Sequence, residues 1–189
     1  MALFNQIKVL TDDDIEDVTK LYADSCKYVE YFQKMFGKKD CSLDIYREFL
    51  PDVTAAIRQG YCCGIYKKGI LTGILLSINW FDYKNEHPVL FNHMFNCDNP
   101  TTKILENYAN QFNNNVYFIF AVGVVDGCRC QGLGRQLLRN YVKRVNRKAT
   151  IFSDCLYENA QSLWLKEGFH IVDLTEDDNE IKVVVKLSS

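Results

Sequence analysis

The feature that most constrains this chain is an apolar run that passes through two glycines into a helical pattern. Residues 116–125 (VYFIFAVGVV) are rich in β-branched and aromatic side chains, which predicts a buried strand. Arg129, Gly132 and Gly134 follow in the spacing R-x-x-G-x-G. From residue 132 onward the apolar residues recur at the spacing of one helix face: Leu133, Leu137, Leu138, Tyr141, Val142 and Val145. This order of strand, glycine turn and amphipathic helix limits what the turn can be used for.

The turn has the properties of an anion site. The first N–H groups of a helix have no partner within the helix, and the helix dipole makes this end positive. Glycines let the backbone approach a bulky anion, because no Cβ stands in the way. The turn lacks the third glycine of the Rossmann fingerprint and the Lys-Ser/Thr pair of a P-loop. We therefore predict a phosphate or pyrophosphate site here, in preference to a glycine-rich connection that binds nothing.

The rest of the pattern predicts a single mixed α/β domain over residues 1–189. Strands or hairpins are expected over four further segments: 4–10, 61–80, 149–156 and 169–187. Helices are expected over three: 11–26, 42–60 and 157–169. Thr11 is expected to cap the first helix, ahead of three acids in its first turn. The second is expected to be interrupted or restarted at Pro51. Residues 81–115 are expected to hold one or two short helices, and an acidic turn is expected at residues 175–180.

Composition argues against several classes of function. The net charge is −2 and the pI about 5.9, so the chain lacks the basic excess of most nucleic-acid-binding proteins. A basic cluster on the predicted helix is expected to be its solvated face: Arg135, Arg139, Lys143, Arg144, Arg147 and Lys148. The eight cysteines include no C-x-x-C pair, and the chain starts without a signal-peptide pattern, so we expect free thiols and no metal site. No apolar run approaches the roughly 18 residues of a membrane span. We expect a cytoplasmic protein with no nucleic-acid or membrane partner.

With these residues in place, the stretch 124–138 resembles the signature of the GNAT superfamily of acyl-CoA-dependent N-acyltransferases. That signature is R/Q-x-x-G-x-G/A, after a strand and at the opening of a helix. A second element of the family is a short helix that ends in Gly-Phe, and residues 158–169 (ENAQSLWLKEGF) match it at Ala160, Leu163, Gly168 and Phe169. The resemblance implies a central mixed, mostly antiparallel sheet of about seven strands, splayed at the central parallel pair and flanked by helices.

The resemblance also implies acetyl-CoA as co-substrate and a primary amine, of a small molecule or a protein, as acceptor. The N–H groups that would wrap the pyrophosphate are those of Arg129, Cys130, Gln131, Gly132, Leu133, Gly134 and Arg135. Pantetheine would pair with the strand backbone at Val122, Gly123 and Val124, where a strand N–H can polarise the thioester carbonyl. Two further cofactor-binding positions are Asn159, two residues from the family's usual asparagine position, and Trp164, in place of the family's usual tyrosine.

Direct attack by a neutral amine needs a group that accepts its proton, and a general acid can assist the leaving thiolate. Because Trp164 cannot act as that acid, the nearest alternatives are Tyr157 and Cys155. The candidates for the base are Asp154, Glu86, His87 and His93. Of all these we select Tyr157 and Asp154 as the catalytic residues. Structural roles stay open for the others, and Asp154 itself could act as a helix cap.

Two other classes of function stay open. The chain could bind coenzyme A without transfer activity, since Trp164 replaces the tyrosine and the strand 116–125 holds no carboxylate. It could also bind a partner through the aromatic segment 27–41. That segment could alternatively fill the core or line an acceptor pocket, together with the acids of the last turn, Glu176, Asp177, Asp178 and Glu180. A monomer or a homodimer is expected.

Overall fold

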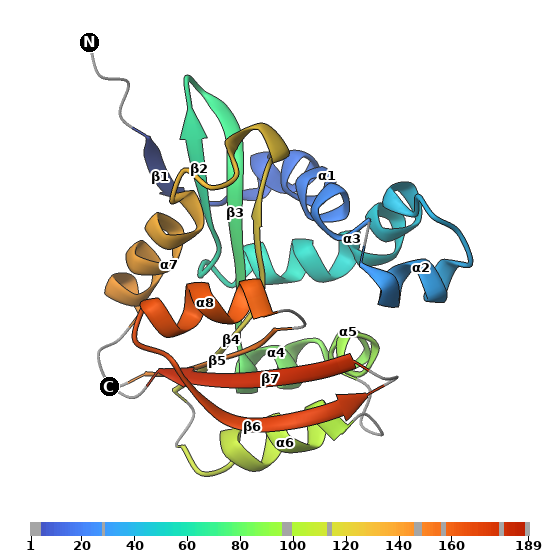
Figure 1. Cartoon of the computed structure of the whole chain (residues 1–189), viewed down its shortest axis with the longest axis vertical. Helices are drawn as coiled ribbons and strands as arrows, with labels where there is room; N and C mark the ends of the chain where they lie inside the picture. The colour runs from blue at the N-terminus through green and yellow to red at the C-terminus, as the bar shows by residue number, and fades with distance from the viewer. Residues whose placement is uncertain are drawn as a thin grey trace. The chain divides into compact units, whose positions relative to one another are not determined.

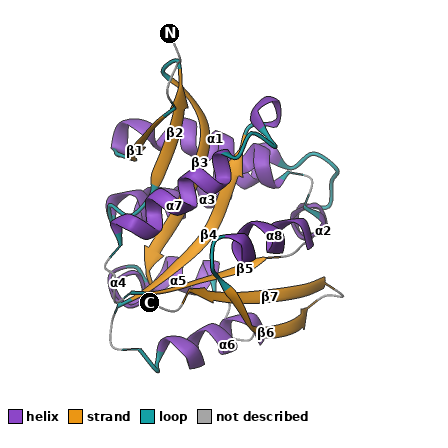
Figure 2. Ribbon diagram, turned by 60° about the vertical axis from the view of Figure 1, so that its left-hand side comes forward, coloured by secondary structure: helices purple, strands orange, loops and turns teal. Residues whose placement is uncertain are grey.

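The computed structural model describes residues 5–27, 29–95, 100–112, 115–145, 149–155, 158–177 and 180–187. Over these residues seven strands form one sheet in the order β1-β2-β3-β4-β5-β7-β6 (Figures 1 and 2). The pairs β1–β2, β2–β3, β5–β7 and β6–β7 are antiparallel, and β4–β5 is parallel. The predicted mixed, mostly antiparallel sheet with a central parallel pair is therefore confirmed.

The chain divides into two compact units. The first contains Met1–Leu76 and Ala121–Tyr141, and the second contains Ser77–Phe120 and Val142–Ser189. Strands β3 and β4 and helix α7 each contribute to both units. The single domain expected from the sequence stays a prediction.

The first unit contains the amino-terminal elements and the glycine turn. Its elements are β1 (Gln6–Val9), the 3₁₀ turn η1 (Asp12–Asp14), α1 (Ile15–Cys26), α2 (Glu30–Phe36), α3 (Ser42–Arg58), β2 (Cys63–Lys67), most of β3 (Ile70–Asn79), the end of β4 (Val116–Val124), η2 (Asp126–Cys128) and most of α7 (Leu133–Arg144). The predicted hairpin of β2 and β3 is confirmed. Its two turn residues, Lys68 and Gly69, have φ angles of 55° and 79°, the backbone that matches the twist of paired strands.

Helix α3 runs through Pro51 without a break, so the predicted interruption is wrong. Proline removes one backbone hydrogen bond from a helix interior, which normally disfavours it there. Here the residues on both sides of Pro51 are held by packing, because α3 contacts α1 and buries Ile45 and Val53 completely. Tertiary burial therefore outweighs the local cost of the proline.

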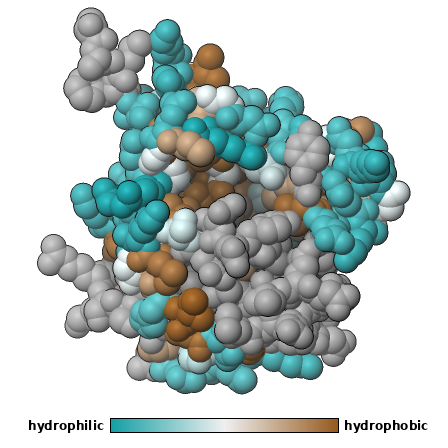
Figure 3. Space-filling model, viewed as in Figure 1, coloured by the Kyte–Doolittle hydropathy of each residue, from teal (hydrophilic) through white to brown (hydrophobic). Residues whose placement is uncertain are grey.

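The aromatic segment packs mainly against α3. The ring of Phe32 meets that of Phe49 edge-on at 5.5 Å between centroids. Figure 3 shows mostly hydrophilic side chains over this part of the first unit, with single apolar ones among them, and Met35 and Leu43 are 48% and 57% exposed. Tyr28 and the side chain of Tyr31 lie outside the described residues. Among the described residues, Phe32 thus fits the core interpretation of the segment.

In the second unit, the described residues between 80 and 112 form three short helices, where one or two were predicted for residues 81–115. Its elements are the end of β3, α4 (Trp80–Glu86), α5 (Pro88–Met94), α6 (Pro100–Ala109), the first part of β4, the end of α7, β5 (Thr150–Cys155), α8 (Glu158–Lys166), β6 (His170–Asp177) and β7 (Glu180–Leu187). Asn79 starts α4, because its Oδ1 accepts hydrogen bonds from the N–H groups of Phe81 and Asp82, each at 3.1 Å. The final strands run into the acidic segment, so the predicted turn at 175–180 is too long. Within the described ranges, no helix is both long and apolar enough to cross a membrane.

Asp14 joins three elements of the first unit. Its carboxylate accepts hydrogen bonds from Thr11 N at 2.9 Å, Thr11 Oγ1 at 3.0 Å and the Tyr66 hydroxyl at 2.6 Å, and Lys8 Nζ lies 3.6 Å away. Burial by itself would raise the pKa of Asp14, but the hydrogen bonds outweigh burial and hold the pKa below its ordinary value of 3.8. The start of the first helix is therefore tied through one ionised carboxylate to β1 and β2.

We expect Asp14→Asn to lower the free energy of unfolding by about 1 kcal/mol at pH 7, the usual size of a lost helix cap. A carboxyl whose pKa is lowered by folding stabilises the protein above its unfolded-state pKa, and this contribution disappears as the pH falls through the folded-state pKa. The difference between wild type and D14N should thus be constant near neutrality and shrink below pH 3.8. Urea unfolding at pH 7, 5 and 3 measures it, with Asp13→Asn at an exposed neighbouring position as control. A difference that persists at pH 3 would contradict the role of the charge.

Candidate functional site

Strand β4 changes its surroundings halfway along its length. Its first part, Val116–Ile119, is buried and pairs in parallel with Thr150–Ser153 of β5. The Ser153 hydroxyl donates to Ile119 O at 2.9 Å, at the last pair of this ladder. Beyond that pair β4 continues, and residues 120–122 are only partly buried. The predicted pantetheine-binding backbone lies in this second part of the strand.

Two glycines of β3 and β4 have no room for a side chain. A Cβ on Gly123 would lie 2.8 Å from Ser25 Oγ and 3.2 Å from Leu21 Cδ2, both on α1. A Cβ on Gly73 would lie 3.1 Å from Gly123 O and 3.3 Å from Leu137 Cδ1 of α7. The glycines therefore let α1 approach β4 and let α7 approach β3. The sequence analysis missed this packing role, although an isolated glycine within a strand pattern signals a close approach.

The turn after β4 is held in shape by its own side chains. Arg129 folds back, so that its Nη2 lies 2.8 Å from Asp126 Oδ1 and its Nε donates to Val124 O at 3.4 Å. Gln131 Nε2 donates to Gly127 O at 3.2 Å and closes the turn from the other side. These bonds cross the turn at both of its ends, so its backbone is ordered by contacts within residues 124–131.

Two left-handed residues then bring the chain into the helix. Cys130 and Gly132 have φ angles of 60° and 76°. Glycine adopts this backbone freely, but it is uncommon for a cysteine. Added Cβ atoms at Gly127 or Gly132 would meet nothing within 4 Å, so the space in front of the turn is open. Successive N–H groups in a turn of this kind form a concave surface that favours anions.

The start of α7 adds further N–H groups to this surface. The first backbone bond of the helix runs from Gln136 N to Gly132 O at 3.1 Å, so the helix does not use the N–H groups of Leu133 and Gly134. The helix is fixed by its apolar face, which is buried at Leu133, Leu137, Leu138 and Tyr141. Its opposite, basic face is exposed at Arg135, Arg139, Lys143 and Arg144, as predicted, while Arg147 and Lys148 lie outside the described residues.

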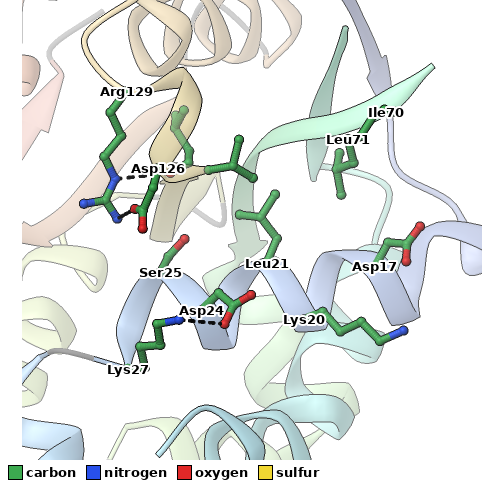
Figure 4. A pocket seen from close by; sticks show the side chains of 12 residues that line it. Asp17, Lys20, Leu21, Asp24, Ser25, Lys27, Ile70, Leu71, Asp126 and Arg129 are labelled. Carbon is green, nitrogen blue, oxygen red and sulfur yellow. Dashed lines mark hydrogen bonds and ion pairs between the residues drawn. The ribbon is translucent and has the colours of Figure 1, made fainter. Parts of the chain in front are cut away.

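A cavity of about 350 Å³ lies next to this turn, within the first unit. Its walls come from one face of α1, the start of β3 and the end of β4 with its turn: Asp17, Lys20, Leu21, Asp24, Ser25, Lys27, Ile70, Leu71, Val124, Val125, Asp126 and Arg129 (Figure 4). The cations at its rim are paired locally, because Lys27 lies 3.3 Å from Asp24 and Lys20 lies 2.7 Å from Glu16. No site was predicted on this face of α1, because the walls of the cavity come from separate parts of the sequence.

The structure describes some of the sequence-selected catalytic and cofactor residues. Asp154 lies on β5 and is half-buried, whereas Tyr157 is outside the described residues. Asn159 lies in α8, and its side chain is outside the described part. Trp164 is only 4% exposed, and its ring packs edge-on against Phe169 at 4.9 Å. Burial, and the charge of Asp154, raise the pKa of the Cys155 thiol to about 11.

The alternative base candidates lie around α4 and α5. Glu86 and His93 are exposed, and His87 is half-buried with its ring 5.4 Å from that of Tyr83. These residues and Asp154 belong to the second unit, while the glycine turn and the cavity belong to the first. Which group accepts the proton therefore stays a prediction.

Comparison with known proteins identifies the fold. No family model and no curated protein matches the sequence. Among solved structures, the C-terminal condensation domain of Ebony, in complex with β-alanyl-dopamine, matches with a TM-score of 0.75 and 13% identity, over 99% of this chain and 100% of that chain. An N-acetyltransferase from Staphylococcus aureus Mu50 matches with a TM-score of 0.67 and 17% identity, over 96% and 100%. YncA from Salmonella typhimurium, with its cofactor acetyl-CoA, matches with a TM-score of 0.62 and 16% identity, over 98% and 94%.

This chain has the fold of the GNAT N-acetyltransferases. The resemblance inferred from the glycine turn and the Gly-Phe helix is thus confirmed at the level of the fold.

The contact at Gly123 gives a test of how the site is built. We expect Gly123→Ala to lower the free energy of unfolding by about 1 to 3 kcal/mol, the usual cost of overpacking, because the new methyl group meets Ser25 Oγ and Leu21 Cδ2. In a Ser25→Ala background the nearer obstacle is gone, so the same substitution should cost less. Chemical denaturation of the four chains measures this difference. Equal costs in the two backgrounds would show that Ser25 does not limit the space at Gly123.

Proposed function

We propose that the chain is an acetyl-CoA-dependent N-acetyltransferase that moves an acetyl group to a primary amine by direct attack in a ternary complex. The observation that carries the proposal is the turn from Arg129 to Arg135. It joins a half-exposed strand end to a helix start through two left-handed residues, and its early N–H groups are outside the helix's own ladder. This arrangement suits a pyrophosphate.

The residues of the turn fit the phosphate end of coenzyme A. The backbone N–H groups from Arg129 to Arg135 would bind the pyrophosphate, and Gly132 leaves its approach clear. The backbone of Val122, Gly123 and Val124 would bind pantetheine, because the recorded ladder between β4 and β5 ends at Ile119. An amide of pantetheine can pair with a strand edge as another peptide would.

Acetyl-CoA would supply an acetyl thioester: the amine forms a C–N bond to the acetyl carbon, the C–S bond breaks, and coenzyme A leaves as the free thiol. The contribution of this chain is to orient the thioester, to polarise its carbonyl and to accept a proton. An N–H of β4 would polarise the carbonyl. Asp154 would accept the proton that the attacking amine loses, directly or through water. Tyr157 would return a proton to the leaving thiolate.

A small-molecule amine is the acceptor that the structural neighbours favour. The Ebony domain was determined with β-alanyl-dopamine, an amide of a small amine, and it has the highest TM-score of the three structures compared above. Asn159 and Trp164 stay proposed contacts to the cofactor. Because Trp164 is only 4% exposed, such a contact is limited to a small part of its side chain.

The second candidate function is a coenzyme A-binding module with weak or no transfer activity. Trp164 favours it, because the residue in the family's tyrosine position is buried against Phe169 and carries no acid. The described part of β4 also carries no carboxylate. This candidate predicts tight binding of acetyl-CoA without release of thiol in the presence of any amine.

Binding is tested by thermal unfolding with and without acetyl-CoA. A ligand at about 100 times its dissociation constant stabilises the folded state by roughly 2.7 kcal/mol. We expect this stabilisation in the wild type and its loss in Gly134→Glu, which places a side chain and a negative charge at the helix start. Asn140→Glu adds the same charge further along α7 and should keep the stabilisation. No stabilisation of a folded wild type would refute the coenzyme site.

Catalysis is tested by thiol release over a panel of small primary amines. We expect turnover with at least one amine, and a loss of about 100-fold in kcat for Asp154→Asn with unchanged stabilisation by acetyl-CoA, since a general base contributes at least this factor. Glu86→Gln is the matched control and should keep its kcat. A loss of kcat in Glu86→Gln, with kcat retained in Asp154→Asn, would instead assign the role of base to Glu86. Stabilisation without turnover on any amine would favour the binding module.

A further inference from the structure

The cysteines of the described residues fall into two groups. Cys41, Cys62, Cys63 and Cys155 are buried free thiols, and Cys26 is mostly buried, which raises the pKa of its thiol to about 12. Cys130 is exposed and Cys128 is half-exposed, and both lie in the turn between β4 and α7. The nucleophile in thiol chemistry is an accessible thiolate. Among the described cysteines, accessible thiols are therefore concentrated at the proposed coenzyme site.

The turn places Cys128 and Cys130 on either side of Arg129. Two residues apart, their Cα atoms are separated by at most about 7 Å. A disulfide needs roughly 4.4 to 6.8 Å between Cα atoms. Arg129 is extended, with φ of −62° and ψ of 159°, which keeps the pair toward the long end of that range. Closure of the pair therefore needs a change of the backbone at Arg129, which shortens this separation.

The surroundings leave room for a reagent to approach. Cβ atoms added at Gly127 and Gly132, which flank the pair, would meet nothing within 4 Å. The guanidinium of Arg129 is drawn back to Asp126 at 2.8 Å, and the Gln131 amide is bonded to Gly127 O. The thiol of Cys130 is itself exposed, so a small reagent can reach it.

We propose that Cys128 and Cys130 are a modification site for low-molecular-weight disulfides, and that their oxidation to an intramolecular disulfide disables the coenzyme turn. The thiolate of Cys130 attacks one sulfur of the reagent, forms a mixed disulfide and releases one thiol. Cys128 then attacks the Cys130 sulfur, forms the Cys128–Cys130 bond and releases the second thiol. One reagent disulfide is reduced, one protein disulfide is formed, and the two protein thiol protons leave on the released thiols.

The effect on coenzyme binding rests on the proposed function. Closure rotates Arg129 away from its extended backbone and disturbs its bonds to Asp126 and Val124. It also changes the path of the chain at Cys130, whose left-handed backbone directs the following N–H groups. The oxidised turn therefore no longer presents its N–H groups to one anion.

The experiment treats the full chain with glutathione disulfide and maps the modified peptides by mass spectrometry. We expect wild type to lose two hydrogens, with a crosslink between Cys128 and Cys130 that dithiothreitol reverses. Cys128→Ser should instead stop at a glutathione adduct on Cys130. Cys26→Ser, at the partly buried thiol on α1, should behave as wild type. Modification confined to other cysteines, or a wild type that stops at the glutathione adduct, would refute the proposed disulfide between Cys128 and Cys130.

The second readout is the stabilisation of the same samples by acetyl-CoA. We expect reduced wild type and reduced Cys128→Ser to be stabilised equally, and oxidised wild type to lose at least nine-tenths of its affinity and regain it with dithiothreitol. A crosslinked chain that binds acetyl-CoA as well as the reduced chain would overturn the effect on the coenzyme turn. A reduced chain that does not bind acetyl-CoA would refute the proposed function instead. The peptide masses alone would then decide whether the Cys128–Cys130 disulfide forms.

Discussion

The helix packing of the first unit depends on two glycines, whose lack of a side chain allows close approach. Gly73 and Gly123 lie in neighbouring strands: a Cβ on Gly123 would press on Ser25 and Leu21 of α1, and a Cβ on Gly73 would press on Ile65 of β2 and meet Leu137 of α7 at 3.3 Å. Ile74, next to Gly73, is among the neighbours of Gly123, while Gly73 itself lies under Leu137 of α7. Because successive residues of a strand point to opposite faces, α1 and α7 cover opposite faces of this part of the sheet. The close packing of both helices sets where β4 ends, and the turn follows from that point.

The position of the turn is set by this packing, and its shape is set by the ion pair and hydrogen bonds of Arg129 and Gln131. The apolar face of α7 is buried, so the start of the helix is fixed in space. The strand is fixed by the contacts around Gly123. Between these two anchors, the chain reverses through Cys130 and Gly132 and is tied by Arg129 and Gln131. An anion site made of backbone N–H groups needs fixed elements on both sides, because these groups cannot change position by side-chain rotation.

Much of this was readable from residue types alone. The apolar run 116–125 and the spacing from Leu133 onward predicted β4 and α7, because burial of one face leaves a periodic pattern. Pro51 was misread, since proline acts on local hydrogen bonding while packing of α3 against α1 is a property of two distant segments. The cavity on α1 was missed for the same reason, as its walls come from three separate parts of the sequence. Trp164 departs visibly from the family pattern, but only its burial against Phe169 indicates a packing role.

The internal bonds of the turn have a consequence for the energetics of recognition. A loop that orders only around its ligand loses conformational entropy in the binding step, and this loss weakens the complex. Here the ion pair of Arg129 with Asp126 and the hydrogen bond from Gln131 Nε2 to Gly127 O are made entirely within the protein. The ordering is completed during folding, so the turn is preorganised. Under the proposed function, the affinity of the turn would then reside largely in the phosphate groups themselves, and inorganic pyrophosphate would retain a large share of the binding free energy of coenzyme A.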